Sequence, residues 1–137
     1  MLVLDASAAL AWVFERANRA EAERARAVLA RLDDLRPIVP TLWHVEVLNG
    51  LVTAQRRRVL SVSKAINFLS RLDRLPIETD AASLSERKPQ IFALAREHGL
   101  SAYDATYLDL ALRLGAALFT FDGKLARAQM KAGVSAP

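Results

Sequence analysis

Four acidic residues stand where the sequence gives little local reason for a charge: Asp5, Glu46, Asp104 and Asp122. Asp5 and Asp122 each follow a short apolar run and precede a helical pattern. In an open parallel α/β sheet, ligands bind beyond the carboxyl ends of the strands, so we expect both aspartates at the same edge. Clustered carboxylates there would bind a hard divalent cation, and all-oxygen ligation suits Mg²⁺ or Mn²⁺.

Three of these residues also have a purely structural interpretation. Asp5 and Asp122 could cap the helices that follow them, because an aspartate oxygen accepts from the free amides of a first helical turn. Asp104 lies three residues after Ser101, which is the spacing of a capping box with aspartate in place of glutamate. Two like charges about 4 Å apart repel by roughly 4 kcal/mol at an effective dielectric of 20, so a cluster without a cation would be unfavourable.

Glu46 is harder to explain as a structural residue. Its neighbours on a helical surface are Leu42, Trp43, Asn49 and Gly50. It therefore does not lie on a charged outer face, and a buried unpaired carboxylate takes up a proton or finds a cation. Asn49 could orient Glu46, contact a substrate, or be a satisfied polar residue of the core.

The helix that carries Asp104 contains a second aspartate with a different environment. Asp104 shares its helical stripe with Tyr107, Leu108 and Ala111. Asp109 points the other way and has Arg113 four residues further on. We therefore expect Asp109 and Arg113 to form a solvated surface pair.

Short β-like runs alternate with helical patterns, which is typical of a parallel α/β sheet. We expect strands at residues 2–4, 38–39 and 117–121, and a short extended segment at 76–78. We expect helices at residues 5–14, 17–35, 40–58, 61–72, 83–98, 101–114 and 123–131. The 137 residues form one domain, 1–137, long enough to bury a core without staples.

The composition narrows the possible classes of protein. The absence of cysteine excludes disulfides and thiolate chemistry, and His44 and His98 are too isolated to suggest a histidine-ligated metal. No apolar run reaches the ~18 residues of a membrane span, and no basic leader precedes Asp5, so we expect a cytoplasmic protein without a membrane partner. The net charge is +4 and 15 of the 19 basic residues are arginine, whose planar fork suits phosphate.

Four segments carry further information in their order and spacing: VLDASA at residues 3–8, LWHVEVLN at 42–49, SAYDATYL at 101–108 and FTFDGKL at 119–125. Together they resemble the PIN domain family, specifically the VapC ribonuclease toxins of bacterial and archaeal toxin–antitoxin pairs. The resemblance covers essentially the whole chain. It implies a short parallel sheet flanked by helices.

The resemblance also implies roles for particular residues. Asp5, Glu46, Asp104 and Asp122 correspond to the family's acidic quartet for one or two Mg²⁺ or Mn²⁺ ions. Ser7 corresponds to the polar residue that supports the first aspartate. Thr120 would add a hydroxyl behind that site, although on an inner strand it could simply be a residue that favours β-structure.

The implied activity is metal-dependent hydrolysis of RNA phosphodiesters by a toxin. Inhibition by a VapB-type antitoxin and assembly into a homodimer are expected from the resemblance alone. Arg56, Arg57 and Arg58 could track substrate phosphates, or could simply place cations at a helix C-terminus.

Three aromatic residues are better explained by packing than by RNA recognition. We expect Trp12, Phe14 and Trp43 in the core or at an interface rather than stacked on bases. The segment 12–14 is also a candidate wall for an apolar groove that would take an amphipathic antitoxin helix.

The main alternative is a catalytically inactive module of the same fold that binds RNA or sequesters an antitoxin. Two other classes fit less well. An aspartyl-phosphate phosphatase needs a second aspartate two residues after the first, and Ser7 stands there. A receiver domain needs an aspartate at the end of a middle strand and a lysine after a late strand, and neither is evident.

Overall fold

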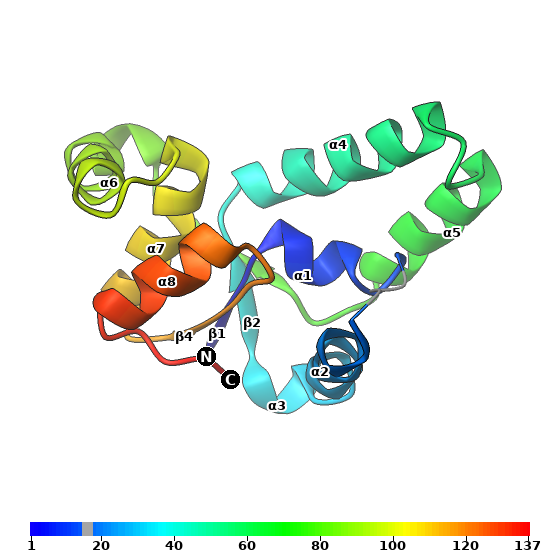
Figure 1. Cartoon of the computed structure of the whole chain (residues 1–137), viewed down its shortest axis with the longest axis horizontal. Coiled ribbons are helices and arrows are strands. Elements are labelled where there is room, and N and C mark those ends of the chain that lie inside the picture. Colours follow the sequence, from blue (N-terminus) through cyan, green and yellow to red (C-terminus); the bar gives the residue numbers. More distant parts are fainter. Residues whose placement is uncertain (15–17) are drawn as a thin grey trace.

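The chain folds around four short parallel strands (Figure 1), and this computed structural model describes residues 1–14 and 18–137. The strands are β1 (Leu2–Leu4), β2 (Pro37–Val39), β3 (Glu78–Thr79) and β4 (Ala117–Phe119), in the spatial order β3-β2-β1-β4. Val3 pairs with both Ile38 and Leu118. The residues of β1 are fully buried, as expected for a parallel strand that is covered on both faces.

The helices surround this sheet. In chain order they are α1 (Ala6–Leu10), α2 (Arg19–Leu29), α3 (Leu32–Leu35), α4 (Leu42–Arg56), α5 (Val62–Leu72), α6 (Leu84–His98), α7 (Ala102–Leu114) and α8 (Gly123–Lys131). In the view of Figure 1, α6, α7 and α8 lie on one side of the strands and α2 and α5 on the other. None of the helices in the described ranges is long and apolar enough to cross a membrane.

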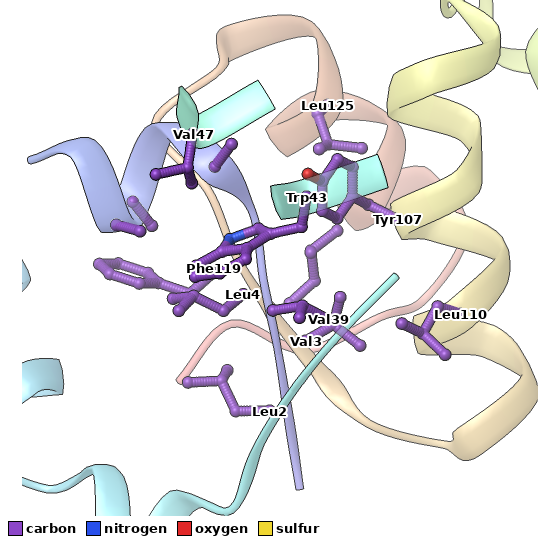
Figure 2. Packing of buried hydrophobic residues seen from close by; sticks show 14 of the residues in the cluster. Leu2, Val3, Leu4, Val39, Trp43, Val47, Tyr107, Leu110, Phe119 and Leu125 are labelled. Atoms are coloured by element: carbon purple, nitrogen blue, oxygen red, sulfur yellow. The ribbon is translucent and has the colours of Figure 1, made fainter. Parts of the chain in front are cut away.

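One hydrophobic core joins the sheet to these helices. Figure 2 shows strand residues packed against Trp43 and Val47 of α4, Tyr107 of α7 and Leu125 of α8. Trp43 is 2 % exposed and Tyr107 is fully buried. The expected α/β architecture with a single compact domain is therefore confirmed.

Several element boundaries follow from local chemistry that the sequence displays. Ser61 caps α5 by accepting a hydrogen bond from the backbone N–H of Lys64. α6 ends at Gly99 and α7 ends at Gly115, both of which adopt the left-handed conformation. The expected ranges for these three helices are confirmed to within a residue.

Other expected boundaries are wrong. The helix expected over residues 17–35 is divided into α2 and α3, because the chain turns at Ala30 and Arg31 and again at Arg36, whose φ is 50°, before it enters β2. The start expected at residue 17 lies outside the described residues. The helix expected over 5–14 is shorter, since α1 ends at Leu10 and turns follow it. The run 117–121 leaves the sheet after Phe119.

A close helix contact places the middle of α4 beside the end of β1. Helix α1, which follows β1 directly, packs against α4. A Cβ at Gly50 would stand 2.5 Å from Leu10 Cδ1, so a larger residue there would force the Leu10 side chain to shift. The small residue suits a close packing of α4, which carries Glu46, against α1 at the carboxyl end of β1.

The expected surface pair between Asp109 and Arg113 is wrong. Asp109 is only 5 % exposed, and Arg87 of α6 donates to both of its oxygens, at 3.0 Å from Nε and 2.5 Å from Nη2. Arg113 instead pairs with Asp80 at 2.5 Å. Helix α6 packs on the face of α7 opposite Asp104, and the helical periodicity of α7 alone could not reveal this cover.

We therefore expect Asp109→Asn to destabilise the fold. The substitution removes the charge and replaces one of the two accepting oxygens by an NH₂ group, which cannot accept from the guanidinium. Its cost should lower the melting temperature by roughly 5–10 °C. Arg87→Met should cost more, because it leaves a buried carboxylate without a partner. Thermal unfolding followed by circular dichroism measures both, and an Asp109→Asn melting curve that matches wild type would contradict this view of the pair.

Candidate functional site

Asp5 is held by two hydroxyl groups at the carboxyl end of β1. It is 4 % exposed, and its Oδ2 accepts from Ser7 Oγ at 2.5 Å and from Thr120 Oγ1 at 2.7 Å. Those hydroxyl oxygens in turn accept from the backbone N–H groups of Phe121 and Asp122, at 3.0 Å and 2.9 Å. Each hydroxyl thus donates to Asp5 and accepts from the segment that leads to Asp122. The ladder between β1 and β4 ends at Leu4 and Phe119, so Asp5 and Thr120 both lie just beyond it.

Only one of the two aspartates at the strand ends caps the helix that follows it. The side chain of Asp5 makes no capping hydrogen bond to α1. Asp122 does cap α8, because its Oδ1 accepts from the backbone N–H of Leu125 at 2.9 Å. In α7 the cap is Ser101, whose hydroxyl accepts from the N–H of Asp104. The Ser101 hydroxyl also interacts with the carboxylate of Asp104, in line with the expected capping box. Capping therefore involves Asp122 and Asp104, whereas Asp5 caps no helix.

Glu46 has an unsatisfied oxygen beside an unsatisfied hydroxyl. Glu46 Oε1 and Tyr107 Oη are both buried from water and have no hydrogen-bond partner in the described part of the chain. The Tyr107 hydroxyl is nevertheless close enough to lower the pKa of Glu46 slightly. Burial and the charges of Asp5 and Asp104 outweigh this effect and raise the pKa of Glu46 to about 7.

The same mutual repulsion links the other carboxylates. Burial, followed by the charges of Asp122 and Asp5, raises the pKa of Asp104, and the hydrogen bond with Ser101 and the charge of Lys124 oppose this shift. Burial also raises the pKa of Asp5, more than its bonds to Ser7 and Thr120 lower it, and Asp122 adds to the rise. The structure therefore brings the four predicted acidic residues close enough for their charges to interact. Asp5 and Asp122 lie just beyond β1 and β4, and Glu46 and Asp104 lie near the N-termini of α4 and α7.

These carboxylates are gathered but do not form a finished coordination sphere. Among the residues that the structure describes, no three His, Asp or Glu side chains are arranged so that they could hold a metal ion as they stand. Like charges in a partly buried site move apart unless a cation offsets their repulsion. The donor set, all oxygen with one orphaned buried atom on Glu46, fits a hard divalent ion such as Mg²⁺ or Mn²⁺.

An open groove gives access to two of the carboxylates. Its volume is about 550 Å³, and it is lined by Val45, Glu46, Asn49, Gly50, Ser101, Tyr103 and Asp104. Asn49 is exposed in this groove, so its interpretation as a core residue is wrong. Sequence reasoning missed Tyr103 and Lys124 as members of the site. The available signal was their position within one and two residues of Asp104 and Asp122.

The arginine triplet lies away from this groove. Arg56 is ten residues after Glu46 on α4, which corresponds to about 15 Å along the helix axis. Arg56, Arg57 and Arg58 are exposed at that distant end and do not line the groove. Any contact they make with RNA would be remote from the carboxylates.

The aromatic residues expected to pack rather than bind bases do so. Trp43 is buried in the core, whereas Trp12 and Phe14 are partly buried against it. Trp12 donates from Nε1 to the backbone oxygen of Ala25 at 3.0 Å. It also lines a largely apolar hollow of about 180 Å³ with Leu29, Phe68, Arg71, Leu72, Arg74 and Leu75.

The raised pKa of Glu46 predicts how stability depends on pH in the absence of metal. Its pKa is 4.5 in the unfolded chain and about 7 in the folded one, so the folded state holds the proton more tightly. The resulting contribution to the free energy of unfolding is fully present below about pH 4.5 and is lost as the pH rises through about 7. Asp5 and Asp104, whose pKa values are also raised, act in the same direction.

We therefore expect the melting temperature in EDTA to fall between pH 4.5 and 7, and Glu46→Gln to flatten this fall. Melting curves across that range test the assignment. Equal pH profiles for wild type and Glu46→Gln would show that another group carries the proton.

Comparison with known proteins identifies the family to which the chain belongs. Residues 2–130 match the model of the PIN domain family. The chain therefore belongs to the PIN domain family. It is 36 % identical over 125 residues to Ribonuclease VapC3 of Pyrobaculum aerophilum, a match that covers 91 % of this chain and 92 % of that protein. It is 31 % identical over 127 residues to Ribonuclease VapC3 of Mycobacterium tuberculosis H37Rv, covering 93 % and 86 % respectively.

Solved structures with lower sequence identity share the fold. The crystal structure of PAE2754 from Pyrobaculum aerophilum has a TM-score of 0.68 at 23 % identity, and the match covers 93 % of this chain and 78 % of that one. FitAcB from Neisseria gonorrhoeae has a TM-score of 0.66 at 20 % identity, with coverage of 99 % and 96 %. The family match and the VapC3 relatives place this chain with the VapC-type PIN domains.

Proposed function

We propose that this protein is a metal-dependent endoribonuclease that acts as the toxin of a VapBC-type toxin–antitoxin pair. The observation that carries the proposal is the convergence of four mutually repelling carboxylates at one edge of the sheet, two of them lining an open groove. The names of the VapC3 relatives support RNA as the substrate class. The basic net charge of +4 is consistent with an anionic polymer as ligand.

In this proposal Asp5, Glu46, Asp104 and Asp122 would hold Mg²⁺ or Mn²⁺. A bound ion would supply a Lewis acid that activates a water molecule and offsets the charge that develops on the phosphate. Ser7 and Thr120 fix the Asp5 carboxylate by donating to its Oδ2. Glu46, whose pKa is about 7, must release its proton before it can bind a cation, so metal affinity should rise with pH.

The remaining partners rest on the family resemblance together with surface features. A VapB-type antitoxin could place an amphipathic helix in the hollow beside Trp12. A second copy of the chain could cover the apolar face of the α4–α5 hairpin, where Val52 and Ile66 are 43 % and 57 % exposed. A homodimer is therefore the proposed assembly, and light scattering after size-exclusion chromatography would test it.

Cleavage of total RNA by the purified chain, with Mn²⁺ in one arm and EDTA in the other, tests the proposed function. We expect cleavage only with the metal, and at subsaturating RNA the rate should fall as salt rises. Expression of the chain alone should arrest growth, and coexpression of the antitoxin should relieve the arrest. Harmless expression with every RNA species intact would favour the inactive RNA-binding or antitoxin-sequestering module.

A further inference from the structure

An exposed aromatic ring stands beside the proposed catalytic carboxylates. Tyr103 directly precedes Asp104 in the first turn of α7 and is 66 % exposed. Val45 directly precedes Glu46 in α4 and is 67 % exposed. Both line the same groove of about 550 Å³, in which Glu46 and Asp104 are less exposed than Tyr103 and Val45. The groove thus combines acidic residues with an outer aromatic and aliphatic rim.

Tyr103 has no partner that would explain its position. It makes no hydrogen bond, ion pair or ring contact within residues 1–14 and 18–137. Phe92 on α6 is a useful contrast, because it is equally exposed at 65 % but has the guanidinium of Arg96 5.8 Å from its ring centroid. The ring faces of Tyr103 are therefore available to a ligand.

The charge of the groove indicates which part of a ligand would contact this ring. An acidic cluster repels phosphates unless a cation offsets its charge, and Lys124 lowers the pKa of Asp104 only against larger opposing causes. A strand held only through its phosphates would be poorly oriented at such a site. An uncharged flat base escapes this repulsion, and stacking on an aromatic side chain contributes about 1–3 kcal/mol per base. The aliphatic Val45 extends the apolar surface on the other helix.

We propose that Tyr103 and Val45 form a nucleobase subsite, in which Tyr103 stacks on an unpaired base of the RNA strand whose phosphate lies at Asp104 and Glu46. This inference rests on the proposed function and extends it from phosphate chemistry to substrate recognition. It favours single-stranded or looped RNA, because a base paired within a helix cannot present its face. It requires no particular base, since every base has a face that can stack.

Binding of short RNA oligomers tests the subsite. In each arm the protein carries Glu46→Gln, so that bound RNA is not cut, and affinity for an oligoadenylate is measured by fluorescence anisotropy with Mn²⁺ present. We expect Tyr103→Ala to weaken binding about tenfold, whereas Tyr103→Trp and Tyr103→Phe should retain it. Phe92→Ala is the matched control and should bind like the parent. An abasic ribose-phosphate oligomer of the same length should bind equally to parent and Tyr103→Ala.

Three results would overturn the subsite: unchanged affinity in Tyr103→Ala, an equal loss for the abasic oligomer, or an equal loss in Tyr103→Phe. If Tyr103→Ala no longer copurified with a coexpressed antitoxin but still bound RNA with the parent's affinity, the ring would belong to a protein interface instead. Cleavage of total RNA by chains with Glu46 intact separates the two proposals. If wild type cleaves RNA but Tyr103→Ala does not change RNA affinity, only the subsite is refuted. If wild type does not cleave RNA but its binding depends on the bases and on Tyr103, only the nuclease function is refuted.

Discussion

Asp5→Asn, Glu46→Gln and Asp104→Asn are each expected to reduce metal-dependent RNA cleavage about a hundredfold or more while the chain stays folded. The substitutions are nearly isosteric, and residues that act as a unit lose most of their joint effect when one is removed. Burial, followed by repulsion among the carboxylates, raises the pKa of Glu46 and of Asp104 in the native chain. Removing a charge relieves both costs. The metal-free variants should therefore melt at or above the wild-type temperature.

The control for this series must be an aspartate with the same chemical change and no role at the site. Asp109 is unsuitable, because its ion pair with Arg87 supports the fold. Asp33 is exposed on α3, which precedes β2 and so lies toward the opposite end of the strands. Asp33→Asn should cleave like wild type. If two of the three site variants cleaved RNA at the wild-type rate, the assignment of the site would be wrong.

Much of the site was predictable because its residues are marked by local exceptions in the sequence. Asp5 and Asp122 interrupt apolar runs at strand ends, and parallel strands deliver such residues to one edge. Glu46 is a charge with apolar or uncharged helical neighbours. These signals require only periodicity and the rule for parallel sheets. The bonds from Ser7 and Thr120 to Asp5 follow once both strand ends are placed side by side.

What could not be predicted depends on contacts between distant elements. Asp109 looks like a solvated residue of α7 until α6 is packed against its face, and the resulting pair with Arg87 spans 22 residues. Gly50 looks like a flexible position in a helix until Leu10 is found where its Cβ would be. β4 ends at Phe119 because its partner β1 ends at Leu4, the residue opposite it. Each is a tertiary effect on a local pattern.

Addition of Mn²⁺ is expected to raise the melting temperature of the metal-free chain by roughly 10 °C. A ligand that binds only the folded state contributes about 2.7 kcal/mol at 100 times its dissociation constant, and a domain of this size converts that energy into a shift of this order. The gain should grow from about pH 6 to pH 8, because the cation must displace the proton that Glu46 holds with a pKa of about 7.

Glu46→Gln supplies the internal control, because it removes one carboxylate together with that proton. Its melting shift on addition of Mn²⁺ should be smaller than in wild type and should depend less on pH. Asp33→Asn should shift like wild type. Calorimetric titration with Mn²⁺ measures the affinity directly. A melting temperature that ignores both millimolar Mn²⁺ and EDTA at every pH would mean that the carboxylates gather for another reason, and the proposed metal centre would have to be abandoned.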